Sequence, residues 1–278
     1  MKTKHLRLMQ RAYVILFFCF MYLPIAYMIV FSFNQSKGYA LFTGFTLKWY
    51  TSLLHNSAIL SALRVSLEVA LISAVIATVL GTAASLGIAS MSRKSRLVIT
   101  NITYIPVVNP EIITGISLML LFVAYQRFAE GVSWLPDTIM GMPTLLIAHI
   151  AFNVPYVIFN VTPKLKQLDI KLYEAALDLG CDPRQAFFKV ILPEILSAFL
   201  ICLTYSIDDF MISYFNCGTV ETLPIAIYSM TRKKVSPEIY ALSTIMFVVI
   251  LTIILISNAM ESREYRRDQK ALRGEDVK

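Results

Sequence analysis

The stretch that decides the fold opens with residues 174–180, Glu-Ala-Ala-Leu-Asp-Leu-Gly, and closes with residues 190–193, Val-Ile-Leu-Pro. It is polar and amphipathic, and it lies between two long apolar runs, where a simple connection would need only a few residues. Apolar residues in and just before it recur at spacings of three and four, the period of an α-helix: Leu172, Ala175, Ala176, Leu179, Ala186, Phe187 and Val190. The pattern predicts two short helices with an apolar face that has to be covered.

A turn separates these two short helices at residues 180–183, Gly-Cys-Asp-Pro. Gly180 suits the position past a helix end, and Asp182 followed by Pro183 is typical of an N-cap and a first helical turn. Two interpretations fit this arrangement. The segment is either a connector that lies on the bilayer or a helix that inserts into a groove on a partner protein, and periodicity alone does not separate them.

The composition independently indicates a membrane protein. Of the 278 residues, 57% are hydrophobic and 15% are charged, and the mean hydropathy is +0.65, whereas a soluble chain has about 25% charged residues. A bilayer core needs roughly 20 mostly apolar residues per helix. Six stretches meet this length: residues 12–33, 59–90, 97–126, 142–162, 191–212 and 239–260. Because alternating strand patterns are absent, we expect one all-α polytopic domain over residues 1–278 with six transmembrane helices.

Basic residues set the expected orientation. With the N-terminus in the cytoplasm, most lysines and arginines fall on the cytoplasmic side, as the positive-inside rule requires. Both termini and residues 163–190 are then cytoplasmic, and the run 232–234, Arg-Lys-Lys, is an exception on the outer side. The net charge of +7 therefore follows from topology, and we expect the lipid bilayer, and no nucleic acid, as a partner of this basic chain.

The residue spacings argue against a metal centre, a disulfide framework and a nucleotide site in this chain. The four cysteines and three histidines follow no ligand or disulfide pattern. No G-x4-G-K-S/T phosphate loop occurs, so the chain has no ATP site of that kind. We therefore expect no catalytic residue, no metal and no cofactor bound by this chain, and any ATP-driven step needs another subunit.

Carboxylates inside the predicted spans are candidates for a substrate pathway, because charge within a membrane is costly and usually faces a bundle interior or a water-filled path. Asp208 and Asp209 fall near the outer end of the fifth span, and Glu111 lies at a comparable depth in the third. Spaced carboxylates together with aromatic faces suit an organic cation, through charged hydrogen bonds and cation–π contact. The aromatic candidates are Tyr205 and Tyr214, with Tyr104, Tyr125 and Tyr156 as further ones.

Structural explanations compete with each of these assignments. Residues 109–111, Asn-Pro-Glu, are also typical of a helix start, with an acid at the positive end of the helix dipole. Asp208 and Asp209 are neighbours and would lie about 100° apart on one helix, so both cannot face the same cavity. One of them can instead cap the end of the span or pair with a lysine of a neighbouring subunit. Tyrosines in spans commonly serve as packing or interface anchors.

Residues 174–193 resemble the EAA signature of ABC-importer permeases, E-A-A-x3-G-x9-I-x-L-P, with Val190 in place of the usual Ile. The resemblance implies the type I importer permease fold and a coupling helix that docks into a cleft on a cytoplasmic ATPase. It implies a polar contact for Glu174 and a turn at Gly180. The other coupling residues it implies are Ala175, Ala176, Leu192 and Pro193. ATP and Mg²⁺ would be bound by the partner ATPase.

Further strings are similar to those of spermidine/putrescine permeases within this family: residues 31–36, 44–50, 206–213, 223–230, 235–238 and 241–245. They imply the membrane subunit of an ATP-driven importer that moves polyamines inward across the bacterial cytoplasmic (inner) membrane. The implied partners are two cytoplasmic ATP-binding subunits, a second homologous permease and an extracytoplasmic polyamine-binding protein. An importer for another cationic or organic solute fits the same residues, and a non-transporting scaffold or a channel is a further alternative.

Substitution of Glu174 or Gly180 is expected to abolish transport and to leave membrane insertion intact, because both residues would act where the coupling helix meets the ATPase. Solute uptake by cells and the amount of protein in the membrane fraction measure the two effects. If both variants transport normally, the segment is not a coupling helix.

Overall fold

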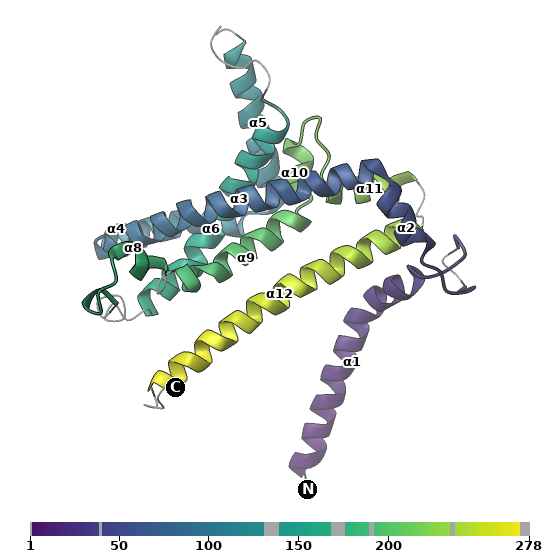
Figure 1. Ribbon diagram of the computed structural model, residues 1–278, viewed down its shortest axis with the longest axis horizontal. Helices are drawn as coiled ribbons and strands as arrows, with labels where there is room; N and C mark the ends of the chain where they lie inside the picture. The colour runs from purple at the N-terminus through teal and green to yellow at the C-terminus, as the bar shows by residue number, and fades with distance from the viewer. Residues whose placement is uncertain are drawn as a thin grey trace. The chain divides into compact units, whose positions relative to one another are not determined.

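The computed structural model describes residues 2–38, 41–130, 139–167, 176–188, 192–233 and 237–272. Over these ranges the chain is helical, with one isolated antiparallel bridge between Asn34 and Phe45 and no strand. The helices are α1 (Lys2–Phe31), α2 (Lys48–His55), α3 (Ser57–Ser90), α4 (Arg93–Val108), α5 (Glu111–Ala129), α6 (Met142–Gln167), α8 (Pro183–Ala186), α9 (Leu192–Asp208), α10 (Met211–Asn216), α11 (Leu223–Lys233) and α12 (Pro237–Leu272) (Figure 1). The all-α prediction is confirmed.

Five of the described helices are long and apolar enough to cross a membrane. They are Met9–Phe31 in α1, Ser57–Ser90 (α3), Glu111–Ala129 (α5), Met142–Leu165 in α6 and Pro237–Met260 in α12. A shorter apolar helix, Ile195–Asp208, lies within α9. Helices suit a lipid environment because their backbone polar groups are paired within the segment. The polytopic prediction is confirmed, although two of the six predicted spans, residues 97–126 and 191–212, are each interrupted.

The third predicted span, residues 97–126, is wrong as one continuous helix. The chain breaks between α4 and α5 at Asn109 and Pro110, whose ψ angles are both 134°. Proline has no N–H for the helical ladder and disfavours the helical region for the residue before it, so α4 ends here. Asn109 donates its N–H to the carbonyl of Ile105 and its side-chain N–H to Thr114 Oγ1. Asn109 is thus the C-cap of α4, and not the N-cap of the following helix that its position before proline suggests.

The fifth predicted span, residues 191–212, also has the wrong bounds. Helix α9 ends at Asp208, residues 209–210 are not helical, and α10 begins at Met211. Apolar residues continue on both sides of this break, so the mean hydropathy of a window of residues stays high across it. Because of the break, Asp209 lies between two helices, whereas the hydropathy pattern places it inside a single helix.

Two compact units divide the chain, and each is described by itself. The first contains the residues up to Leu60 together with Ile227–Val249, and the second contains Ser61–Ala226 and the residues from Ile250 onward. In the first unit, the buried Asn34 organises the segment between α1 and α2. Its carbonyl accepts the indole N–H of Trp49 at 2.7 Å, and its side chain bonds three backbone groups of residues 38–43.

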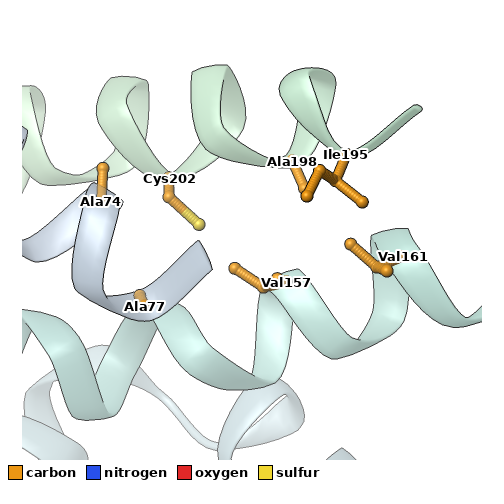
Figure 2. Close-up of a cluster of buried hydrophobic side chains, with 7 residues drawn as sticks. All are labelled: Ala74, Ala77, Val157, Val161, Ile195, Ala198 and Cys202. Atoms are coloured by element: carbon orange, nitrogen blue, oxygen red, sulfur yellow. The ribbon is translucent and has the colours of Figure 1, made fainter. Parts of the chain in front are cut away.

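The core of the second unit consists of small and branched side chains from three helices. Seven buried residues form it, namely Ala74 and Ala77 on α3, Val157 and Val161 on α6, and Ile195, Ala198 and Cys202 on α9 (Figure 2). Small residues allow helix backbones to approach closely, which favours helix association in lipid. Gly81 extends this contact along α3, since a Cβ there would lie 2.5 Å from the Cβ of Val157. The packing of these three helices positions the residues of the candidate site.

Gly81→Ala is expected to destabilise the protein by about 1–3 kcal/mol, because the added methyl group overpacks a tight helix contact. Gly87→Ala is the matched control on the same helix, since a Cβ at Gly87 meets no atom within 4 Å. Thermal unfolding of the purified membrane protein measures both variants. Equal melting temperatures would contradict the close α3–α6 contact.

Candidate functional site

The three carboxylates that the sequence singles out come together in the second unit. Glu111 lies in the first turn of α5, Asp208 is the last residue of α9, and Asp209 follows it in the break before α10. Helix α5 packs against α10, which begins two residues after Asp209. The structure therefore assembles one acidic cluster from two segments that are about a hundred residues apart in the chain.

Close packing between α5 and α10 brings the two segments together. Gly115 on α5 lies directly against α10, because a Cβ there would be 3.1 Å from both the carbonyl oxygen of Met211 and the ring of Phe215. The side chain of Asn216 donates to the carbonyl of Gly115 at 3.1 Å and to that of Ile212 at 2.9 Å. This contact fixes the start of α5, and with it Glu111, beside the start of α10.

Asp209 closes the first turn of α10. One carboxylate oxygen accepts the N–H of Ile212 at 3.2 Å, and the other accepts the N–H of Ser213 at 2.8 Å. The residue is buried, whereas Asp208 is exposed. The expectation that the two acids lie about 100° apart on one helix is therefore wrong, because the helix ends between them. Asp209 thus caps the start of α10, whereas the alternative left open by the sequence was a cap at the end of the span.

Glu111 and Asp208 differ from Asp209 in their contacts. Over the described ranges, neither of these exposed carboxylates has a hydrogen-bond or ion-pair partner. Glu111 begins α5 and Asp208 ends α9, and the packing of α5 against α10 holds these two positions near each other. Two like charges held together without a counter-charge favour the binding of a cation between them.

His149 on α6 is the residue that sequence reasoning missed. Its Nε2 lies 2.9 Å from the hydroxyl of Ser213 and 3.6 Å from the carboxylate of Asp209, and its side chain is 1% exposed. One turn further along α6, Asn153 donates to the hydroxyl of Ser206 at 2.7 Å. The hydroxyl of Ser206 also lies 3.1 Å from that of Ser73 on α3.

A signal for these residues exists in the sequence. The polar residues His149, Asn153, Tyr156 and Asn160 follow one another at spacings of four, three and four in an otherwise apolar helix. Such spacing places them on one face of the helix. The stripe contains a single histidine, so it does not have the spacing of metal ligands. Among the described residues there is no group of three His, Cys, Asp or Glu that could hold a metal ion.

Two tyrosines border the acidic cluster. The rings of Tyr156 and Tyr205 meet edge to face at 4.9 Å, and Phe152 packs against Tyr156 at 5.0 Å. Tyr205 is 40% exposed, so part of its ring is open to a ligand.

The remaining tyrosine candidates lie elsewhere. Tyr214 packs beside Phe210 and Phe215, with ring centroids 5.3 and 5.4 Å away. Tyr104 on α4 packs against Phe159 and lines an open hollow of about 480 Å³. The other residues that line this hollow are Asn101, Ile105, Val108, Asn109 and Pro110. The hollow therefore ends at the chain break directly before Glu111.

The predicted coupling segment is described from Ala176 to Phe188, and Glu174 and Ala175 lie outside the described residues. Gly180 has a φ of +87°, a value that favours glycine, and Asp182 forms a capping box with Gln185 at the start of α8. The predicted turn and N-cap are thus present. Leu192 and Pro193 form the first turn of α9, and Leu192 packs on the core of the second unit.

The apolar face of this segment is only partly covered. Ala186 is fully buried, and Phe187 packs against the core of α3, α6 and α9. By contrast, Leu179 is 86% exposed and Phe188 is 61% exposed. The segment thus offers apolar side chains that nothing in the described chain covers.

Comparisons with known proteins agree with this architecture. The family described as "Binding-protein-dependent transport system inner membrane component" matches residues 77–267. The putrescine transport system permease protein PotI of Escherichia coli (strain K12) is 36% identical over 272 residues, which cover 94% of this chain and 95% of PotI. The spermidine/putrescine transport system permease protein PotC of the same strain is 33% identical over 256 residues, with coverage of 90% and 93%.

Solved structures show the same fold. A bacterial ABC transporter involved in the import of the acidic polysaccharide alginate contains a chain that superposes with a TM-score of 0.65 at 18% sequence identity. The match covers 94% of this chain and 96% of that chain. At this identity the likeness concerns the fold alone, and it confirms the predicted type I importer permease fold.

Asp209→Asn is expected to lower stability by about 1–3 kcal/mol, because an amide keeps only one of the two oxygens that accept N–H groups of α10. Asp208→Asn is the matched control, since Asp208 is exposed and forms no hydrogen bond within the described chain. Melting temperatures of the purified protein distinguish the variants. An equal loss of stability in both would contradict the different roles of the two acids.

Proposed function

Because the chain belongs to the family of binding-protein-dependent transport system inner membrane components, we propose that it forms one side of a pathway that carries polyamines into the cell. As a member of this family it is the multi-pass, non-catalytic permease component of an ABC importer in the inner membrane, and a separate subunit hydrolyses ATP. The similarity to permeases named for putrescine and for spermidine/putrescine extends over most of the chain and supports this substrate class.

The observation that carries the proposal is the pair of exposed carboxylates, Glu111 and Asp208, beside two tyrosines. A polyamine is a chain of methylene groups that separates ammonium groups. Its ammonium groups would donate charge-assisted hydrogen bonds to Glu111 and Asp208, and its methylene and ammonium groups would pack on Tyr156 and Tyr205. Such a site suits a cation and repels an anion.

The working importer, in this proposal, needs subunits that this chain does not contain. Two cytoplasmic ATP-binding subunits would hold ATP and Mg²⁺, a second homologous permease would supply the other half of the pathway, and an extracytoplasmic protein would deliver the polyamine. Residues 1–278 would act as one transmembrane domain with both termini in the cytoplasm. A solved relative in fold, the alginate transporter, has been captured in complex with a ligand-bound periplasmic protein, which supports a delivery partner of this kind.

The ATPase would drive the movement of the pathway helices through residues 163–190. The exposed Leu179 and Phe188 would insert into the ATPase, with Glu174, Ala175 and Ala176 at the same contact and Gly180 at the turn. Closure of the ATPase dimer on ATP would move this segment. Because Leu192 and Pro193 start α9 directly after it, the movement would pass to the helix that ends at Asp208. Alternating access would follow as the two permease halves rock about the site.

Another organic cation is the second candidate substrate. The same carboxylates and tyrosines would accept any extended solute with a positively charged nitrogen, so the residues of the site favour a cation more strongly than a particular polyamine. Tyr214, which packs with Phe210 and Phe215, would then be a further aromatic contact along the path.

Asp208→Asn and Glu111→Gln are each expected to lower the uptake efficiency, Vmax/KM, for spermidine and putrescine at least tenfold, since each removes a charge-assisted hydrogen bond worth about 1.5–3 kcal/mol. Uptake of labelled polyamine by cells that express the chain with its partner subunits measures the effect. The amount of assembled complex is followed in parallel.

Glu68→Gln is the matched control for a lost carboxylate. Glu68 forms an exposed ion pair with Arg64 at 2.7 Å, within α3, and it is not part of the acidic cluster. Its substitution is expected to leave uptake unchanged. Normal uptake by both Asp208→Asn and Glu111→Gln would remove these residues from the pathway, and an absence of polyamine uptake by the wild type would make the substrate assignment wrong.

A further inference from the structure

One face of α6 forms hydrogen bonds with residues on both sides of the break between α9 and α10. Before the break, the hydroxyl of Ser206 accepts the side-chain N–H of Asn153 at 2.7 Å. After the break, the hydroxyl of Ser213 lies 2.9 Å from Nε2 of His149. His149 and Asn153 are four residues apart and thus lie on the same face of consecutive turns. One turn of α6 thus contacts α9 and the other contacts α10, and Asp208 lies in the chain between these two contacts.

His149 also lies next to the carboxylate of Asp209, which accepts backbone N–H groups in the first turn of α10. Its Nε2 lies 3.6 Å from Asp209 Oδ2, which accepts the N–H of Ser213. Nδ1 is buried and has no hydrogen-bond partner among the described residues. Because acceptors surround Nε2 and none is near Nδ1, the tautomer with hydrogen on Nε2 fits this site, and Nε2 donates to the hydroxyl of Ser213.

We propose that His149 is a positioning residue that sets the direction of the Asp208 carboxylate. Asp208 ends α9, so the direction of its side chain depends on the angle at which the chain leaves that helix. His149 fixes this angle through Ser213 and Asp209, while Asn153 anchors the preceding turn. At 1% exposure, His149 lies too deep to meet the solute itself. The inference rests on the proposed function, because it takes Asp208 as the group that meets the cation.

The first test compares His149→Leu with His149→Gln in the assembled importer, reconstituted in proteoliposomes with its partner subunits. Leu removes the donor, whereas the amide of Gln places an N–H near the position of Nε2. His149→Leu is expected to raise the KM for spermidine roughly tenfold with little change in Vmax, and His149→Gln to restore most of the loss. In an Asp208→Asn background, His149→Leu is expected to lower Vmax/KM no further, because the positioned group is already absent.

The second test does not depend on the solute. Hydrogen–deuterium exchange of the peptide that spans residues 209–216 reports the hydrogen bonds that Asp209 accepts. His149→Leu is expected to speed this exchange roughly tenfold, since the start of α10 loses the contact between Ser213 and His149 of α6. Val161→Ala is the matched control, because Val161 is also buried on α6 but belongs to the apolar core and has no polar side-chain atom. It is expected to leave the exchange of residues 209–216 unchanged.

Unchanged exchange in His149→Leu would overturn the inference. So would a fall in Vmax that matches a fall in assembled complex while KM stays constant, because that result describes a structural role alone. If the wild-type importer takes up neither spermidine nor putrescine, the proposed substrate is wrong, and the exchange rates still decide whether His149 holds the break.

Discussion

Two backbone hydrogen bonds to Asp209 are the interaction on which the rest of the site depends. In the lipid core, backbone N–H groups need partners within the protein or in ordered water, so a span can end and restart where the freed groups are satisfied. Asp209 does this for Ile212 and Ser213. The helix can therefore stop at Asp208 and leave that carboxylate exposed at a helix end, next to Glu111 at the start of α5.

The site also requires that its helices lie close together, and small residues allow this. Gly115 lets α5 lie against α10, and the alanines of α3 let α6 and α9 approach it closely. Larger side chains at these points would separate the helices that hold the two exposed carboxylates. The polar contacts of α6 then fix the break itself, so the acidic cluster is held by packing on one side and by hydrogen bonds on the other.

The sequence predicts much of this fold, because long apolar runs, the Gly180 turn and the Asp182 cap are local signals. The errors arise where hydropathy, averaged over many residues, hides a local break in the helix. Residues 97–126 and 191–212 look continuous by hydropathy, and only the partners of Asp209 show why the second run breaks. The three carboxylates could be selected as rare charges in apolar spans. Their division into exposed and capping groups depends on where the chain breaks. The polar stripe of α6 marks His149 in the sequence but does not show its contacts with Ser213 and Asp209.

The central claim is that Glu111 and Asp208 line the path of a cation. The most direct measurement is a cryo-electron-microscopy map of the assembled importer, trapped during turnover with spermidine. The account predicts elongated density between the two carboxylates and along Tyr156 and Tyr205. Spermidine density that contacts neither carboxylate, in a pathway on another face of this chain, would contradict it.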